Sequence, residues 1–171
     1  MRLGEAPVLN TERLVLRPYE IADFEAFSRY FASPRSRFTD GPVSRAHSWT
    51  LFAAGAGIWR LEGHGAWTIT RAGEDTSIGL VSLNKAIELP APDLGWILWE
   101  GFEGEGFALE AARAARDFAF TELGWSELLS GIHQANSASI RLAERMGASH
   151  DPSLSVASEP ETRVYRHGRG D

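Results

Sequence analysis

The alternation of apolar and polar residues predicts a strand near the start of the chain. Within residues 11–17, Leu14 and Leu16 fall on one side, while Arg13 and Arg17 fall on the other. This period of two is typical of a strand that buries one face. The pattern therefore predicts that a strand opens the fold.

Apolar residues at helical spacing predict two helices after this strand. The first spans about residues 20–32, where large apolar residues recur every three or four positions. The second spans about residues 44–60 with Ser44 as its cap, although Gly55 and Gly57 each destabilise a helix by roughly 1 kcal/mol relative to alanine.

The middle of the chain changes to strand patterns. Residues 66–71 and 76–83 read as a hairpin around a turn-rich segment. Residues 94–99 are almost continuously apolar, which is typical of a strand buried on both faces. A glycine-spaced turn, residues 101–106, follows at once and leads into a helix with one apolar stripe and one charged stripe.

The last third of the chain predicts a strand, a helix and two further strands. The strand covers residues 125–133, and Asn136 is placed to cap a helix that runs from Ser137 to Met146. Residues 153–158 and 162–167 read as a second hairpin. The whole order, β-α-α-β-β-β-α-β-α-β-β, predicts a mixed sheet flanked by helices in one domain, residues 1–171.

The glycine turn is the strongest indication of function. A helix that begins directly after a glycine turn directs unpaired N–H groups, at the positive end of its dipole, toward one point. Such a point is a natural site for a phosphate or pyrophosphate. Gly104 and Gly106 would let the backbone approach that ligand closely.

Composition narrows the class of protein. Hydrophobic residues make up 43% and charged residues 23% of the 171 residues, which predicts a soluble globular domain. The net charge of −6 argues against nucleic acid as the main partner and favours a cationic substrate. The chain contains no cysteine, so thiolate catalysis and cysteine-ligated zinc are excluded. No signal-like or membrane-spanning run is present, so we expect a cytoplasmic protein without a membrane partner.

Three segments together resemble the GCN5-related N-acetyltransferases (GNAT), and within them the ribosomal-protein N-acetyltransferase branch (RimJ/RimL-like). They are TERLVLRP at Thr11–Pro18, the G-x-G turn with its A-x-E-A-A helix at Gly104–Ala112, and N-x-x-S-x-R-x-x-E-x-x-G at Asn136–Gly147. The resemblance covers nearly the whole chain. It implies an α+β (mixed α/β) fold whose mostly antiparallel sheet has about six to seven strands, a splayed and bulged central strand, and about four helices.

The resemblance also implies acetyl-CoA as the acetyl donor and a set of site residues. The turn and first helical residues would hold the pyrophosphate; they are Gly101, Gly104, Glu105, Gly106, Phe107 and Ala108. Backbone groups of Ile97, Leu98 and Trp99 would bind the pantetheine arm, as would the side chain of Asn136. Ser139 would donate a proton to the leaving thiolate, and the N–H of Leu98 would stabilise the developing oxyanion. Trp99 is equally well read as sheet core, and Asn136 as a helix cap only.

The general base stays open at this point. His133 has the right titration range and follows the strand beside the splay, but it also reads as an ordinary histidine at a strand end. Glu100, Asp93 and His64 are the other candidates. No pair of histidines has the spacing of a metal site, so we expect no metal.

The acceptor is predicted to be a primary amine, taken directly without a covalent enzyme intermediate. A protein N-terminus, an amino acid, a small amine, an aminoglycoside-like polycation and a protein lysine remain alternatives. Glu103 and Glu105 border the proposed phosphate site, where the family commonly has aromatic or basic residues. They motivate a second hypothesis, a non-catalytic acyl-CoA-binding module. The six Trp and nine Phe residues leave room for an apolar homodimer interface or for a well-filled monomer core.

Overall fold

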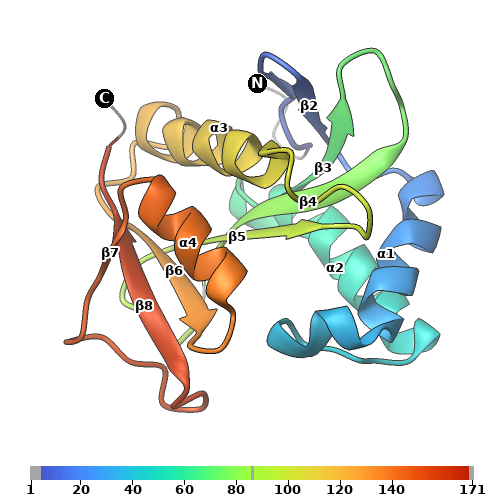
Figure 1. Cartoon of the computed structure of the whole chain (residues 1–171). Coiled ribbons are helices and arrows are strands. Elements are labelled where there is room, and N and C mark those ends of the chain that lie inside the picture. Colours follow the sequence, from blue (N-terminus) through green and yellow to red (C-terminus); the bar gives the residue numbers. More distant parts are fainter. Residues whose placement is uncertain (1–4, 86, 170–171) are drawn as a thin grey trace.

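The protein folds around one sheet with helices on both faces (Figure 1). The computed structural model describes residues 5–85 and 87–169. Within them the sheet has eight strands, in the order β1-β2-β3-β4-β5-β6-β8-β7. The strands are β1 (Leu9–Asn10), β2 (Leu14–Arg17), β3 (Ala66–Arg71), β4 (Ser77–Asn84), β5 (Asp93–Leu98), β6 (Leu128–His133), β7 (Ser149–His150) and β8 (Thr162–His167).

The helices follow the predicted order. They are α1 (Phe24–Ala32), α2 (Arg45–Glu62), α3 (Phe107–Thr121) and α4 (Ser137–Arg145), with short 3₁₀ turns η1 (Ile21–Asp23) and η2 (Pro34–Phe38). Ser44 caps α2 as predicted, because its hydroxyl accepts the N–H of His47. The α2 helix continues through both of its internal glycines and ends at Gly63, whose φ of 72° is left-handed. No helix in the described ranges has the length and apolar character needed to cross a membrane.

Each face of the sheet has its own apolar cluster. On one face, α3 buries the predicted stripe, including Phe107 and Phe118, together with Leu14 and Leu16 of β2. On the opposite face, the aromatic rings of α1 and α2 pack against Trp99, which directly follows β5. Leu94 packs with the α3 cluster. The strand β5 is therefore covered on both sides, as its apolar sequence predicts.

The sheet divides into two parts between β5 and β6. Every other neighbouring pair is antiparallel, whereas β5 and β6 run parallel and pair only at Asp93 and Leu129. Beyond that pair the two strands diverge (Figure 1). The predicted splay of the central strand is confirmed, and it opens a gap between α3 and α4.

The bulge expected in the central strand is not found in its pairing with β4. The β4–β5 register is unbroken along all of β5. The shift in register lies instead between β3 and β4, at Ile69 and Thr70. The gap therefore opens because β5 and β6 diverge rather than because β5 carries an extra residue.

The predicted second hairpin is wrong in one of its strands. Residues 153–158 form turns and irregular backbone, while β8 pairs with β6 and with the short β7 directly after α4. Local hydrogen bonds hold the segment out of the sheet: Ser153 donates to Asp151, and the Ser158 N–H donates to Glu88. The first strand was also predicted too long, because Thr11 forms a turn with Leu14.

Candidate functional site

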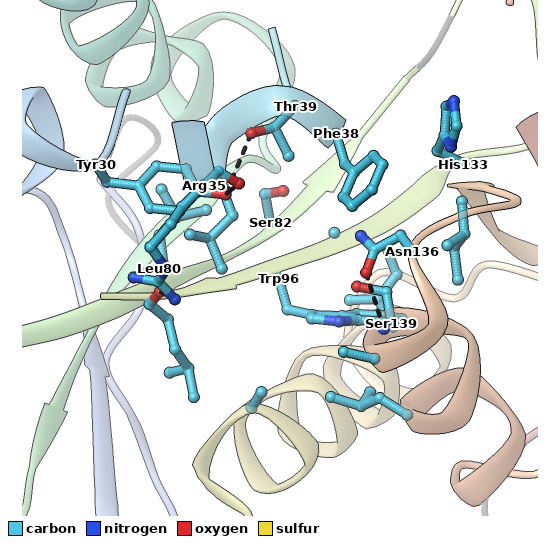
Figure 2. Close-up of a pocket in the computed structure, with 18 of the residues that line it drawn as sticks. Tyr30, Arg35, Phe38, Thr39, Leu80, Ser82, Trp96, His133, Asn136 and Ser139 are labelled. Atoms are coloured by element: carbon cyan, nitrogen blue, oxygen red, sulfur yellow. Dashed lines mark hydrogen bonds between the residues drawn. The ribbon is translucent and has the colours of Figure 1, made fainter. Parts of the chain in front are cut away.

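A cavity of about 950 Å³ occupies the gap between β5 and β6 and extends over the sheet toward α1 and α2. Figure 2 shows Asn136 and Ser139 beside Trp96, and Tyr30, Arg35 and Thr39 across from them. Eight of the predicted site residues line this cavity: Ile97, Leu98, Gly104, Gly106, Ala108, His133, Asn136 and Ser139. Four others do not: Trp99, Gly101, Glu105 and Phe107.

The register of β5 decides which backbone groups face the gap. The N–H of Trp99 donates to Ile78 in the line of β4 at 2.9 Å. Because successive residues of a strand point their polar groups to opposite sides, Ile97 also pairs toward β4. The backbone groups of Trp96 and Leu98 therefore face the widening gap.

Trp96 of β5 and Trp99, which directly follows β5, lie on opposite faces of the sheet. The indole of Trp99 is buried against α1 and donates to the hydroxyl of Ser77 at 2.8 Å. Trp96, only partly buried, lines the cavity. The alternation of a strand predicts that Trp96 and Trp99 lie on opposite faces, but the sequence does not show which of these faces borders the gap. Trp96, not Trp99, borders the predicted cofactor gap.

The glycine turn leaves a row of N–H groups without partners. Gly101, Gly104 and Gly106 have φ of 90°, 84° and 83°, a region that favours glycine. Within the described part of the chain, no acceptor bonds the N–H groups of residues 104–108. They lie at the positive end of α3. This turn can hold a doubly charged group through its backbone alone.

Arg13 and Glu110 fix the turn in this form. The guanidinium of Arg13 donates to the carbonyl of Glu105 at 3.0 Å and to the carboxylate of Glu110 at 2.7 Å. Thr11 also donates to Glu110. Partial burial works in the opposite direction, but these hydrogen bonds leave the pKa of Glu110 below its usual value. The first two family motifs thus contact each other in space.

Neither Glu103 nor Glu105 places an unpaired carboxylate against the N–H groups of residues 104–108. Glu103 forms an ion pair with Arg35 of η2 and accepts the N–H of Gly101 at 2.8 Å. Glu105 is exposed and does not line the cavity. The arrangement leaves the positive end of α3 open.

The helix α4 adds a hydroxyl, an amide and two cations to the gap. Asn136 caps the helix by accepting the N–H of Ser139 at 3.2 Å. Asn136 therefore both caps α4 and lines the cavity. Arg141 and Arg145 line the cavity one and two turns further on and have no ion pair among the described residues. The sequence analysis assigned neither arginine a role, although Arg141 belongs to the third motif and the spacing of four places Arg145 on the same helix face, which also carries Ala138.

The candidate bases lie in different surroundings. His133 accepts the N–H of Ala135 through Nδ1, at 3.1 Å, and its Nε2 lies 3.2 Å from Glu161. Both ring nitrogens are therefore engaged. Glu100 and His64 do not line the cavity, and His64 is buried beside Trp125.

Asp93 is the carboxyl group at the root of the gap. It lines the cavity and accepts the N–H of Gly131 at 2.8 Å. Its removal from water raises its pKa from 3.8 to about 6; the bond from Gly131 opposes this rise, and the charge of Glu159 adds to it. Asp93 can accept a proton near neutral pH. For the described residues, no group of three or more potential metal ligands is found.

Comparison with known proteins gives consistent results. A family model described as an acetyltransferase (GNAT) domain matches residues 13–149. The uncharacterized N-acetyltransferase p20 of Bacillus licheniformis is 29% identical over 171 residues, which cover 95% of this chain and 89% of that relative. The crystal structure of an acetyltransferase from Agrobacterium tumefaciens matches with a TM-score of 0.89 and 40% identity, covering 95% of each chain.

A more distant match is RimL, the ribosomal L7/L12 alpha-N-protein acetyltransferase, solved in complex with coenzyme A. It has a TM-score of 0.76 and 16% identity, and the match covers 96% of this chain and all of RimL, 100%. At this identity the likeness concerns the fold alone.

Proposed function

The chain belongs to the GNAT acetyltransferase family, and from this premise we propose that it transfers acetyl from acetyl-CoA directly to a primary amine. The observation that carries the proposal is the gap between β5 and β6, with the unpaired N–H groups of residues 104–108 at its mouth. GNAT acetyltransferases use acetyl-CoA. The RimJ/RimL-like branch remains part of the proposal, supported by the three motifs.

The residues present fit the pyrophosphate and the pantetheine arm of acetyl-CoA. Residues 104–108 would hold the pyrophosphate, and Arg141 and Arg145 would add positive charge on the opposite wall. Trp96 and Leu98 offer their backbone groups to the pantetheine amides, as a neighbouring strand would. The side-chain amide of Asn136 keeps its N–H groups available, because only its oxygen caps α4.

In the proposed mechanism, Asp93 accepts the proton of the attacking amine, either directly or through a water. A pKa of about 6 leaves it mostly ionised at neutral pH and still able to take a proton. Of the two β5 residues whose backbone groups face the gap, Trp96 is the nearer to Asp93, whereas Leu98 lies five residues away, about 16 Å in an extended strand. The N–H of Trp96 rather than that of Leu98 therefore donates to the thioester oxygen as negative charge develops there. Ser139 returns a proton to the leaving thiolate. His133 would have to break an existing contact to act as the base, so Asp93 is the better candidate.

No protein nucleophile is needed for this direct transfer, since a neutral amine attacks a thioester unaided. An α-amino group with a pKa near 7.7–8.0 loses its proton more readily than a lysine near 10.4. An N-terminal or similarly weakly basic amine is therefore the easier acceptor.

Calorimetry with acetyl-CoA, followed by thiol release with a panel of amines, tests the proposal. We expect binding and acceptor-dependent release. Binding without release for any acceptor would instead support the acyl-CoA-binding module that the acidic loop suggested. Absence of binding would exclude both functions.

A further inference from the structure

The cavity has a second arm, on the face of the sheet opposite α3. We call this part the acceptor arm; it is lined by Tyr19, Phe27, Tyr30, Leu51, Leu80 and Ile97. These residues belong to, or pack against, the aromatic cluster of α1 and α2. The β5 strand separates the arm from α3, so the cofactor gap and the acceptor arm meet along one strand.

The acceptor arm offers mainly apolar surface. Tyr19 stacks on Phe52 with ring centroids 5.0 Å apart, and the hydroxyl of Tyr30 is engaged by Thr39. The hydroxyl of Tyr19 has no hydrogen-bond partner within the described ranges. Burial raises the pKa of Tyr19, so this hydroxyl stays neutral. The arm can therefore bury an apolar group and bond one polar atom. A cation borders it, the guanidinium of Arg35, which lies 5.7 Å from the ring centroid of Tyr30, and its charge is paired with Glu103.

The unpaired charges of the cavity near the proposed base favour an amine and disfavour a carboxylate. Asp93 and Glu159 line the cavity and are both acidic. Arg35 is occupied, because it pairs with Glu103 and donates to the carbonyl of Leu98 at 3.3 Å. Arg37 is exposed and lies over the ring of Phe38, at 4.5 Å from its centroid. A carboxylate next to the reacting amine would thus approach Asp93 without a buried cation to pair with.

We infer that the acceptor is a primary amine carrying an apolar side group, with any neighbouring carboxylate absent or masked as an amide. This inference rests on the proposed function. An arylalkylamine and a peptide N-terminus with a hydrophobic first residue share this chemistry. Free amino acids and polycations do not: the first carry a carboxylate, and the second have no apolar group to fill the arm.

A matched series of amines tests the inference. We expect phenylalaninamide and 2-phenylethylamine to be acetylated with kcat/KM at least about tenfold above phenylalanine, glycinamide and spermidine, since one well-filled apolar site discriminates by that order. Comparing 2-phenylethylamine with a peptide that begins with phenylalanine shows whether the acceptor is an arylalkylamine or a peptide N-terminus. Equal or better rates with phenylalanine, glycinamide or spermidine would overturn the inference.

Two substitutions in α2 test the role of the acceptor arm, one inside the arm and one outside it. Leu51 lines the arm, whereas Leu61 on the same helix is 83% exposed. We expect Leu51→Arg to lower kcat/KM for phenylalaninamide about tenfold or more and to leave the acetyl-CoA Kd within about twofold. Leu61→Arg should change neither quantity. An unchanged kcat/KM in a folded Leu51→Arg variant would contradict the inference.

Failure of the proposed function gives a different result. If acetyl-CoA does not bind and no amine releases thiol, the acetyltransferase proposal fails. Calorimetry with phenylalaninamide and glycinamide on the wild-type protein then decides the inference alone. Preferential binding of phenylalaninamide would uphold the apolar arm without the reaction, and equal or absent binding of the two would overturn it.

Discussion

The cofactor gap and the acceptor arm offer different chemical groups to a ligand. The gap relies on backbone groups, those of residues 104–108 and of two β5 residues, and on one short helix. The acceptor arm relies on side chains from α1, α2 and the sheet. In the proposed function, backbone groups would therefore hold acetyl-CoA, and side chains would select the amine.

The largest effect is expected at the proposed base, Asp93, on the strand that both regions share. The Asp93→Asn substitution should lower kcat by about 10²- to 10⁴-fold, because it removes the proposed base, and should leave the acetyl-CoA Kd unchanged. Steady-state kinetics and calorimetry measure the two quantities. A kcat within twofold of wild type would show that the base lies elsewhere, with His133 the next candidate.

The same substitution should not destabilise the fold at pH 7.5. The folded-state pKa of Asp93 lies above its ordinary value, at about 6 against 3.8. The folded state therefore holds this proton more tightly, and the contribution of Asp93 to stability falls as pH rises from about 4 to 6. Asparagine removes this penalty and keeps an acceptor for Gly131. We expect its Tm at pH 7.5 to equal or exceed that of wild type.

The backbone side of the comparison is tested at Gly104. The Gly104→Val substitution forces a branched side chain into φ of 84° and should weaken acetyl-CoA binding about 10- to 100-fold by moving the N–H groups. Gly73→Val is the matched control, since Gly73 has φ of 80° and lies in the β3–β4 turn. The control should lose similar stability but bind acetyl-CoA normally. Equal affinity in both variants would exclude the turn as the pyrophosphate site.

A pH profile tests the junction in a second way. Because Asp93 acts in its ionised form, kcat/KM should fall tenfold for each pH unit below about 6. The Asp93→Asn variant should lack this acid limb in its residual activity. Persistence of the limb in that variant would assign it to another group.

A smaller effect is expected from the charges of α4. Arg141→Gln should weaken acetyl-CoA binding by about three- to tenfold, with the loss shrinking at high salt, because an exposed cation contributes on the order of 1 kcal/mol. Arg163→Gln removes the same charge from an exposed position on β8, outside the cavity, and should have no effect. Equal losses in both variants would indicate a general charge effect.

The smallest effect is expected at the acidic loop. Glu105→Gln should change acetyl-CoA affinity by less than about twofold, because this exposed side chain lies outside the cavity and is screened. A titration at low and high salt measures it. A tenfold gain in affinity would place the carboxylate against the phosphates and revive the argument for a weak binder.

Most of the fold could be predicted because its signals are local. The period of two at Leu14 and Leu16 and the Ser44 cap of α2 depend only on neighbouring residues. The prediction failed at residues 153–158, which alternate like a strand but have no sheet edge to join, since β7 occupies the place beside β8. Whether an alternating segment becomes a strand depends on a partner that its own sequence does not contain.

The site could be predicted in part for the same reason. The glycine turn and Asn136 carry their signals in consecutive residues, so the cofactor gap could be expected at these positions. No contact with the cofactor was assigned to Trp96 or Arg141, because that depends on which face of an element borders the cavity. Arg35 pairs with Glu103 across 68 positions of the chain, a contact that no local pattern indicates.

Residues close together in the chain are enough to predict the family resemblance, the order of most elements and the turn that presents its N–H groups. The tertiary structure is needed to see where β5 and β6 separate, that Glu103 pairs with Arg35, and that aromatic rings of α1 together with Leu51 of α2 line the acceptor arm. These features depend on distant segments meeting, and side-chain packing between such segments sets where a cavity forms and what it can bind.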